Sequence, residues 1–373
     1  MPSPTEIYVD PAINANSGTG TLIDPYGDLQ YALNTATRDS TNGNRFNIKA
    51  GTAEVLTAAV TLTTYGTPDL NAPLIFQGYT SAAGDGGDGD INGNAGNFTI
   101  WAGGSAHVSF GDLVLRNTGT ASLITIGSYG RVRRCYLHTA TNASFATLNG
   151  SAAELSDSRL ECYAQGVVLS GSGLKIEGNW FTHAGGGSNR RCIQHSAFNG
   201  SQITRNVFSL GAVDVDAVYL AERGCHVENN SFLGAACTGS AIHGIASNGD
   251  DNTVINNLIE GFSGTGGIGI ELDAGSHIGL YAGNAFFNNA TNESGVSGAV
   301  FVDEGDNESL ASTPYAKSGA DSYANRHIYY APLDVGNVWG GAQPTLFGLD
   351  KGAIQHAAAA SGGANIFAGG IIR

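Results

Sequence analysis

The chain has 373 residues, of which 55 are glycine and only 13% are charged, and its formal net charge is −15 at pH 7. The charge argues against nucleic acid and anionic membranes as partners, because both require clustered basic residues and the 17 lysines and arginines are scattered. The many glycines and few good helix formers favour short strands joined by tight turns.

The first 60 residues predict a strand, a capping helix and a first coil. Residues 7–9 are expected to form the opening strand. Asp28 is a suitable N-cap for four apolar residues with the spacing of a one-sided helix, Leu29, Ala32, Leu33 and Ala36. Such a helix would cover the exposed edge of the first strands.

The N-terminus, MPSPTEIYVD, has neither the basic segment nor the apolar stretch of a signal peptide, and no run is long enough to span a bilayer. We therefore expect a chain made in the cytoplasm, without a leader. Its final location would be a virion or particle surface if the protein is viral, or extracellular if it is a secreted enzyme whose leader has been removed.

A glycine- and aspartate-rich loop, GDGGDGDINGNAG, follows a buried-type strand at residues 74–76. Its carboxylates Asp85, Asp88 and Asp90 could bind calcium, although the loop has neither the EF-hand order nor a GGxGxD repeat. The alternative is a solvated turn. No other cofactor is predicted.

One short pattern recurs between Val108 and Phe286: an aliphatic residue, two spacers, a small or amide residue, one spacer and an apolar residue. Its eight copies are separated by 24, 23, 21, 27, 24, 27 and 27 residues and begin at Val108, Val132, Leu155, Ile176, Ile203, Val227, Val254 and Tyr281. A period in the twenties indicates stacked repeats.

The amide position of the later copies predicts an asparagine ladder. Because the amide and the apolar residue are two apart, both point to the same side of a strand. Asparagines in register can hydrogen-bond from coil to coil: Asn179, Asn206, Asn230, Asn257 and Asn284. The earlier copies have Gly111, Cys135 and Ser158 at this position, so the ladder is expected to begin partway along the chain.

A second apolar series lies between these copies, at Ile124, Ala146, Val168, Ile193, Val218, Ile242 and Ile268. Each coil therefore has at least two short strands, which predicts an all-β, single-stranded parallel β-helix, right-handed because parallel crossovers almost always are. A β-sandwich or a propeller is the alternative. One domain is expected, with coils over residues 61–287, an irregular closing region over 288–355 and a flexible tail over 356–373.

These coils, such as IEGNWF, ITRNVF and VENNSF, resemble the pectin-lyase-like superfamily of right-handed parallel β-helix proteins. That group includes polysaccharide lyases, glycoside hydrolases, and phage tailspikes and other virion appendages. The resemblance covers most of the chain and concerns architecture, which does not fix function. It implies that any chemistry lies on the outer face of one sheet, with clustered aspartates and calcium plus a basic residue in lyases, or several aspartates in hydrolases.

Simple alternation places an outward column beside the second apolar series: Leu169, Gln194, Tyr219, His243 and Gly269. That column contains no carboxylate. The best acidic candidates are Asp214 and Asp216, which are two apart and would face one side, with Glu222 and Arg223 at the end of the same strand. Arg190 and Arg191, beside His195, are further candidate bases, and solvated turn charges are the alternative.

Aromatic and amide side chains on this face suggest glycan binding without chemistry, by Gln194, Tyr219, His243 and Trp180. Outward apolar residues could also support a trimer, at Trp180, Val207 and Leu258, a stripe that Ser231 interrupts. Five cysteines at unpaired spacings are expected to be buried thiols: Cys135, Cys162, Cys192, Cys225 and Cys237.

Two functions are compatible with these features. The first is a non-catalytic structural or glycan-binding β-helix displayed on an assembly, such as a phage virion appendage or decoration protein, which self-associates or attaches to a particle through the apolar end of its tail (Ile366, Phe367, Ile371 and Ile372). A simple disordered terminus is the alternative for that tail. The second function is a polysaccharide lyase or glycoside hydrolase acting on an extracellular polysaccharide. The missing carboxylate column favours the first.

Overall fold

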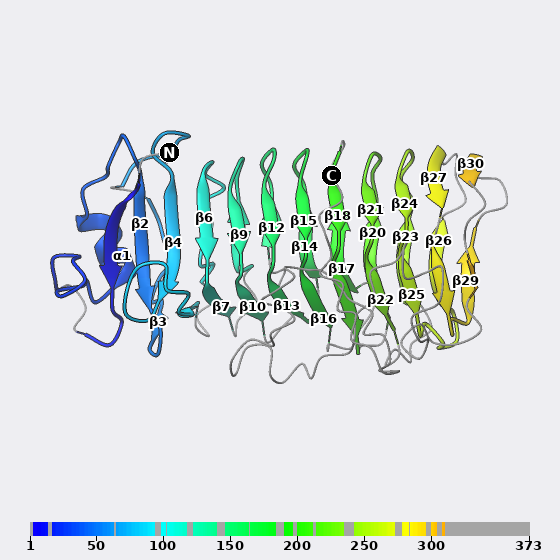
Figure 1. Ribbon diagram of the computed structural model, residues 1–373, viewed down its shortest axis with the longest axis horizontal. Helices are drawn as coiled ribbons and strands as arrows, with labels where there is room; N and C mark the ends of the chain where they lie inside the picture. The colour runs from blue at the N-terminus through cyan, green and yellow to red at the C-terminus, as the bar shows by residue number, and fades with distance from the viewer. Residues whose placement is uncertain are drawn as a thin grey trace, which may run out of the picture. The chain divides into compact units, whose positions relative to one another are not determined.

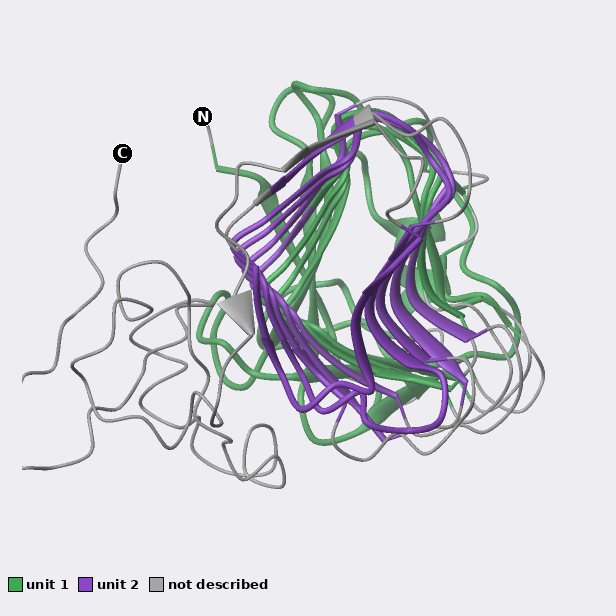
Figure 2. Cartoon of the chain, turned by 90° about the vertical axis from the view of Figure 1, so that its right-hand side faces the viewer, with its two compact units in different colours: residues 1–175 green, residues 176–373 purple. Residues whose placement is uncertain are grey.

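The computed structural model describes residues 3–309 except for 14–16, 63–64, 94–97, 102, 118–121, 140–145, 164, 184–189, 197–199, 212–213, 235–241, 273–277, 283, 296–299 and 304–307. The chain divides into two compact units, unit 1 (Met1–Lys175) and unit 2 (Ile176–Arg373), coloured separately in Figure 2. The predicted tail and most of the predicted closing region lie outside the described residues.

A short helix, α1 (Leu29–Thr35), forms where the apolar spacing predicts it. Asp28 is its N-cap, and a carboxylate oxygen of Asp28 accepts a hydrogen bond from the backbone N–H of Tyr31 at 2.6 Å. Leu29, Ala32 and Leu33 are buried against the first strands. No helix among the described residues is long and apolar enough to cross a membrane.

The strands of unit 1 pair in parallel in three sheets (Figure 1). The first sheet contains β1 (Thr5–Val9), β2 (Asn44–Lys49), β4 (Leu74–Tyr79), β6 (Val108–Gly111), β9 (Arg131–Arg133) and β12 (Glu154–Ser156). The second contains β3 (Ala53–Val55), β5 (Gly89–Asn92), β7 (Leu113–Asn117), β10 (Tyr136–Thr139) and β13 (Arg159–Cys162). The third contains β8 (Ile124–Ile126), β11 (Ala146–Leu148) and β14 (Gln165–Leu169).

Unit 2 repeats this arrangement from β15 (Lys175–Glu177), a strand of the first sheet. That sheet continues with β18 (Gln202–Thr204), β21 (His226–Glu228), β24 (Thr253–Ile255), β27 (Ile278–Ala282) and β30 (Val300–Asp303). The second sheet contains β16 (Trp180–His183), β19 (Val207–Leu210), β22 (Ser231–Leu233), β25 (Leu258–Glu260), β28 (Ala285–Phe287) and β31 (Glu308–Ser309). The third contains β17 (Arg190–His195), β20 (Val215–Leu220), β23 (Ile242–Ser247), β26 (Gly267–Leu272) and β29 (Thr291–Ser294).

From β2 onward, consecutive strands of the chain thus fall on different sheets, and each sheet pairs strands from successive coils. The parallel β-helix predicted from the repeat is confirmed, and the sandwich and propeller alternatives are wrong. The repeat register also holds from Ile203 through Val227 and Val254 to Tyr281. It is wrong in the first copy, because Phe110 rather than Val108 pairs with Val132. Leu113, not Gly111, therefore occupies the ladder position of that coil.

The five predicted ladder asparagines lie in one column inside unit 2, at the turn from the first sheet to the second. In each step, the backbone N–H and the side-chain amide of one asparagine donate to Oδ1 of the next, at 2.9 to 3.1 Å. The amide nitrogen also donates to a backbone carbonyl of the preceding coil; that of Asn230, for example, donates to Ile203 at 2.8 Å. All five are at most 1% exposed, so the ladder satisfies amides that burial would otherwise leave unpaired.

Aromatic rings stack beneath this ladder. The ring centroids of Phe181 and Phe208 are 4.8 Å apart, and those of Phe208 and Phe232 are 4.7 Å apart, with interplanar angles of 10° and 6°. In unit 1 the smaller Ser158 stands at the ladder position, and its Oγ accepts the backbone N–H of Cys135 at 3.1 Å. The four described cysteines are buried thiols outside any disulfide, as predicted: Cys135, Cys162, Cys192 and Cys225. The fifth, Cys237, lies outside the described residues.

Candidate active site

Polar side chains gather on the outer face of the third sheet of unit 2. Strand pairing places Arg191 of β17 beside Asp216 of β20, and Asp216 beside His243 of β23. Glu271 of β26 lies one strand further along, in register with Ala246. Four adjacent parallel strands therefore present a row of alternating charge on one face: Arg191, Asp216, His243 and Glu271.

His243 is at the centre of this row and contacts a carboxylate with each ring nitrogen. Its Nδ1 lies 2.6 Å from Oδ1 of Asp216, and its Nε2 lies 3.2 Å from Oε2 of Glu271. The side chains of His243 and Asp216 are 13% and 15% exposed, whereas that of Glu271 is 39% exposed. Asp216 thus fixes the imidazole from the buried side, and the Nε2–Glu271 contact faces solvent.

Both neighbouring carboxylates affect the protonation of His243. Burial alone would lower its pKa, but the hydrogen bond to Asp216 and the charges of Asp216 and Glu271 raise the pKa above its ordinary value. The protonated form of His243 is therefore more stable than that of an ordinary histidine. A proton donor at Nε2 and a proton acceptor at Glu271 then lie side by side on the outer face of the sheet.

Arg191 extends the row on the other side of Asp216. Its Nε lies 3.5 Å from Oδ2 of Asp216, and its guanidinium carbon lies 3.4 Å from the ring centroid of Tyr219. The side chain is 20% exposed, and its Nε has no hydrogen-bond acceptor within the part of the chain that the structure describes, although Asp216 lies within ion-pair distance. Stacking fixes the guanidinium while leaving its N–H groups available to an anionic ligand.

Simple alternation missed this row because the third-sheet strands bend. In β20 both Ala217 and Val218 are buried, so the outward residues are Asp216 and Tyr219, three apart. The same pattern shifts the pairing, and Ile245 rather than Ile242 lies beside Val218. The predicted inward residues Val168 and Ile268 face outward instead, and Leu169, predicted to face outward, is buried.

A signal for this bend is present in the sequence. The first buried residue of each bend is small: Gly166, Cys192, Ala217, Gly244 and Gly269. A Cβ added at Gly244 or at Gly269 would lie 2.6 Å from a backbone oxygen of the next coil. A column of small residues therefore marks where adjacent coils approach too closely for larger side chains.

Of the four predicted catalytic residues, only Asp216 lies in the row. Asp214 precedes β20 and adopts a left-handed backbone conformation, with φ of 56°. Glu222 and Arg223 follow the other end of the same strand, so the strand length, roughly 20 Å for six residues, separates them from Asp214. The four predicted residues do not converge on one point.

The predicted glycan-binding residues divide in a similar way. Gln194, Tyr219 and His243 lie on the outer face, where the amide of Gln194 donates to Ser196 Oγ at 2.9 Å and Tyr219 accepts from the amide of Asn248 at 2.9 Å. Trp180 is only 3% exposed, so its prediction as an outward, sugar-stacking residue is wrong. Val207 and Leu258 are buried as well, because two consecutive residues are buried where these second-sheet strands begin. This also removes the predicted apolar stripe.

The three aspartates considered for calcium have separate surroundings in unit 1. Asp85 accepts backbone hydrogen bonds from Thr80, Ser81 and Ala82, which hold its pKa well below the ordinary value. Asp90 forms an ion pair with Arg116, and burial raises the pKa of Asp88. Among the described residues, no group of three histidine, cysteine, aspartate or glutamate side chains could hold a metal ion.

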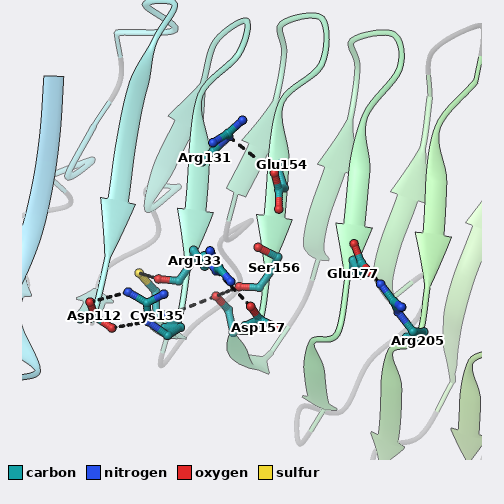
Figure 3. Close-up of polar contacts among 11 residues, drawn as sticks. Asp112, Arg131, Arg133, Cys135, Glu154, Ser156, Asp157, Glu177 and Arg205 are labelled. Carbon is teal, nitrogen blue, oxygen red and sulfur yellow. Dashed lines mark hydrogen bonds and ion pairs between the residues drawn. The ribbon is translucent and has the colours of Figure 1, made fainter. Parts of the chain in front are cut away.

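Other charged residues form ion pairs along the first sheet and its turns (Figure 3). Arg134 donates to both carboxylate oxygens of Asp112 at 2.6 and 2.8 Å, Arg133 contacts Asp157 at 3.1 Å, and Arg131 contacts Glu154 at 3.6 Å. Glu177 and Arg205 form a further pair in unit 2. These pairs link successive coils, and each cation already has a carboxylate partner.

No model of a known protein family matches the sequence, and no curated protein is similar to it in sequence. Among solved structures, the chain is similar to a family 6 polysaccharide lyase from Pseudopedobacter saltans, with 13% identity, coverage of 70% of this chain and 75% of that one, and a TM-score of 0.49. It is also similar to a mannuronic-acid-specific family 6 lyase from human gut microbiota, with 14% identity, coverage of 74% and 73%, and a TM-score of 0.44. A pectate lyase is similar at 12% identity, with coverage of 97% of this chain and 90% of that one, and a TM-score of 0.45. These are likenesses of chain path alone.

Proposed function

We propose that the chain is a polysaccharide-cleaving enzyme whose active site is the row Arg191–Asp216–His243–Glu271. The observation that carries the proposal is the 3.2 Å contact between Nε2 of His243 and Oε2 of Glu271. It places a proton donor and a proton acceptor next to each other on an outer sheet face, where an extended polymer has access. The side chains of Asp216 and Tyr219 hold the two cations of the row in place.

The short separation of donor and acceptor favours β-elimination over hydrolysis. A glycosidase needs its two groups on opposite sides of the anomeric carbon, with carboxyl groups about 5 to 9.5 Å apart. Elimination acts on neighbouring atoms of one sugar: a proton leaves the carbon next to the carboxylate, and the bond to the leaving oxygen breaks on the adjacent carbon. A donor and an acceptor in contact suit that geometry.

In this mechanism Glu271 takes the proton from the carbon next to the sugar carboxylate. The electron pair forms a C=C bond, the C–O bond to the leaving sugar breaks, and His243 Nε2–H protonates the leaving oxygen. Glu271 is then protonated and His243 is neutral, and one proton transfer across their contact restores the starting state. Asp216 is a positioning residue, and Arg191 offers its guanidinium N–H groups to a carboxylate of the polymer.

The test uses a panel of acidic and neutral polysaccharides and measures both unsaturated sugar ends, by ultraviolet absorbance, and new reducing ends. Glu271→Gln should lower kcat about 100-fold or more with little loss of binding, since general acid–base groups typically contribute about 10²–10⁴-fold. Glu228→Gln, on the first sheet of the same unit, is the matched control and should retain full activity.

Each other outcome has a definite meaning. Reducing ends without unsaturated products would show hydrolysis and would remove the elimination mechanism. Cleavage that Glu271→Gln leaves unchanged would place the active site elsewhere. Binding without any cleavage would instead favour the non-catalytic, particle-displayed protein, which stays a prediction because no described contact bears on it.

A further inference from the structure

A second polar cluster lies on the outer face of the second sheet in unit 1. Two rows of outward side chains cross β7, β10 and β13: Val114, Tyr136 and Arg159 lie in one row, and Arg116, His138 and Glu161 lie in the other. The residues between them, Leu115, Leu137 and Leu160, are fully buried. Asp90 of β5 lies beside Val114 at the edge of the first row.

His138 is held in one orientation within this cluster. Its Nδ1 lies 2.9 Å from Oε2 of Glu161, and the other oxygen of Glu161 accepts from Arg159. The hydrogen bond from His138 is the main cause that lowers the pKa of Glu161 to about 2, so the carboxylate remains ionised near neutral pH. A neutral His138 therefore carries its proton on Nδ1 and presents the Nε2 lone pair outward.

Nε2 of His138 has no hydrogen-bond partner in the part of the chain that the structure describes, and the side chain is 37% exposed. Next to it, Arg116 engages Asp90 through Nε and one terminal nitrogen, at 2.9 and 2.7 Å, and is 41% exposed. One terminal N–H₂ group of Arg116 remains as a donor. The cluster thus presents an acceptor and a donor on neighbouring strands, beside the half-buried side chains of Val114 and Tyr136.

The charge balance indicates what such a surface would bind. Arg116 and Arg159 each have a carboxylate partner, so an anion would find no unpaired cation. A sugar hydroxyl can donate to Nε2 of His138 and accept from Arg116, and the apolar face of the sugar ring can cover Val114 and Tyr136. In the row on unit 2, by contrast, Arg191 approaches its carboxylate partner Asp216 only to 3.5 Å, and its Nε has no hydrogen-bond acceptor among the described residues.

We propose that this surface, formed by Val114, Arg116, Tyr136 and His138, is a second, non-catalytic binding site for hydroxyl-rich, uncharged sugar units of a polysaccharide. The site does not depend on the cleavage mechanism proposed above. It requires only that the full chain meets a glycan.

The test is affinity electrophoresis of the full chain through gels containing neutral glucans, mannans or galactans, or acidic polysaccharides. His138→Gln and Arg116→Gln should each weaken binding to a neutral polysaccharide about fivefold to tenfold, as expected for the loss of one hydrogen bond to a sugar. Arg131→Gln removes an arginine that is also ion-paired, with Glu154 on the first sheet of the same unit, and should not change binding. Far-ultraviolet circular dichroism and the melting temperature check that each variant is folded.

Each result decides for or against the site. Loss of binding in both cluster variants, but not in Arg131→Gln, supports the site. If Arg116→Gln fails to fold, loss of binding in His138→Gln alone supports it. The site is overturned if folded His138→Gln migrates like the wild type in a gel with neutral polysaccharide, or if Arg131→Gln loses as much binding as the cluster variants. It is also overturned if the variants lose binding only to acidic polysaccharides, or if no neutral polymer retards the wild type. Glu271→Gln should retain this binding. Failure of the cleavage proposal would therefore appear in the activity of Glu271→Gln, whereas failure of this site would appear in the binding of His138→Gln.

Discussion

His195 is a fully buried histidine on β17, in the interior of unit 2. Burial lowers its pKa to about 4 from an ordinary 6.5, and a backbone hydrogen bond with Glu222 opposes this shift only in part. Sequence reasoning placed it beside two arginines as a possible participant in lyase chemistry. Its burial instead favours the neutral imidazole in the folded unit.

This burial predicts a loss of stability in acid. Because the folded-state pKa is depressed, the unfolded chain binds more protons than the folded chain between about pH 6.5 and pH 4. The stability that depends on a neutral His195 is therefore complete above pH 6.5 and is lost as the pH falls to about 4. This pKa shift corresponds to a change of about 3 kcal/mol in the free energy of unfolding. His195→Leu should therefore reduce the difference in unfolding free energy between pH 7 and pH 4.5, measured by urea denaturation.

The exposed His226 of β21 supplies the control. His226→Leu should leave the pH dependence of the wild type intact. If His195→Leu loses as much stability between pH 7 and pH 4.5 as the wild type does, then His195 does not remain neutral in the folded chain.

The asparagine ladder is the element on which unit 2 depends most clearly. Oδ1 of Asn230 accepts two hydrogen bonds from Asn206, and its amide donates to Asn257 and to the carbonyl of Ile203. Replacing Asn230 by leucine leaves these buried groups without partners on both sides. We expect Asn230→Leu to lower the free energy of unfolding by about 1 to 3 kcal/mol.

Thermal melting of Asn230→Leu, compared with Asn248→Leu at an exposed position, measures this effect. Asn248 donates one hydrogen bond to Tyr219 on the surface, where water can replace the partner. An equal melting temperature for Asn230→Leu and the wild type would mean that the stacked amides contribute no net stability.

The ladder could be predicted from the sequence and the active-site row could not, for a physical reason. Asn206, Asn230 and Asn257 follow a fixed local spacing within each coil, so a repeat of 24 to 27 residues aligns them. The row depends on the bend in the third sheet, which moves the outward positions from two residues apart to three. Asp216 and His243 face the same side only after that bend is taken into account.

The chain as a whole is strongly acidic, but many of its arginines form local ion pairs with carboxylates. The formal net charge is −15, yet Arg116, Arg133 and Arg134 each pair with a carboxylate of a neighbouring coil. In a parallel solenoid the strands of successive coils lie about 4.8 Å apart, so opposite charges at equivalent positions come into contact. Arg191 is paired in the same way with Asp216, and its guanidinium also packs closely on the ring of Tyr219, at 3.4 Å from the ring centroid.

The two units contain buried titratable groups that respond to pH in opposite directions. In unit 1, Glu54 is 3% exposed, and burial, with the nearby charge of Asp28, raises its pKa to about 7. Because this folded-state pKa is above the unfolded value of 4.5, the contribution of Glu54 is complete below about pH 4.5 and is lost as the pH rises through 7. Unit 1 should therefore weaken in alkali, whereas His195 weakens unit 2 in acid.

Hydrogen exchange measured on the full chain at pH 5 and pH 8 separates these effects. Corrected for the intrinsic pH dependence of exchange, the strands around Glu54 in unit 1 should lose protection at pH 8, and those around His195 in unit 2 should lose protection at pH 5. Glu54→Gln should restore protection in unit 1 at pH 8, because the amide is neutral at every pH and has nearly the same shape. Parallel changes in both units, or a Glu54→Gln chain that still loses protection at pH 8, would show that the loss of protection in alkali has a cause other than Glu54.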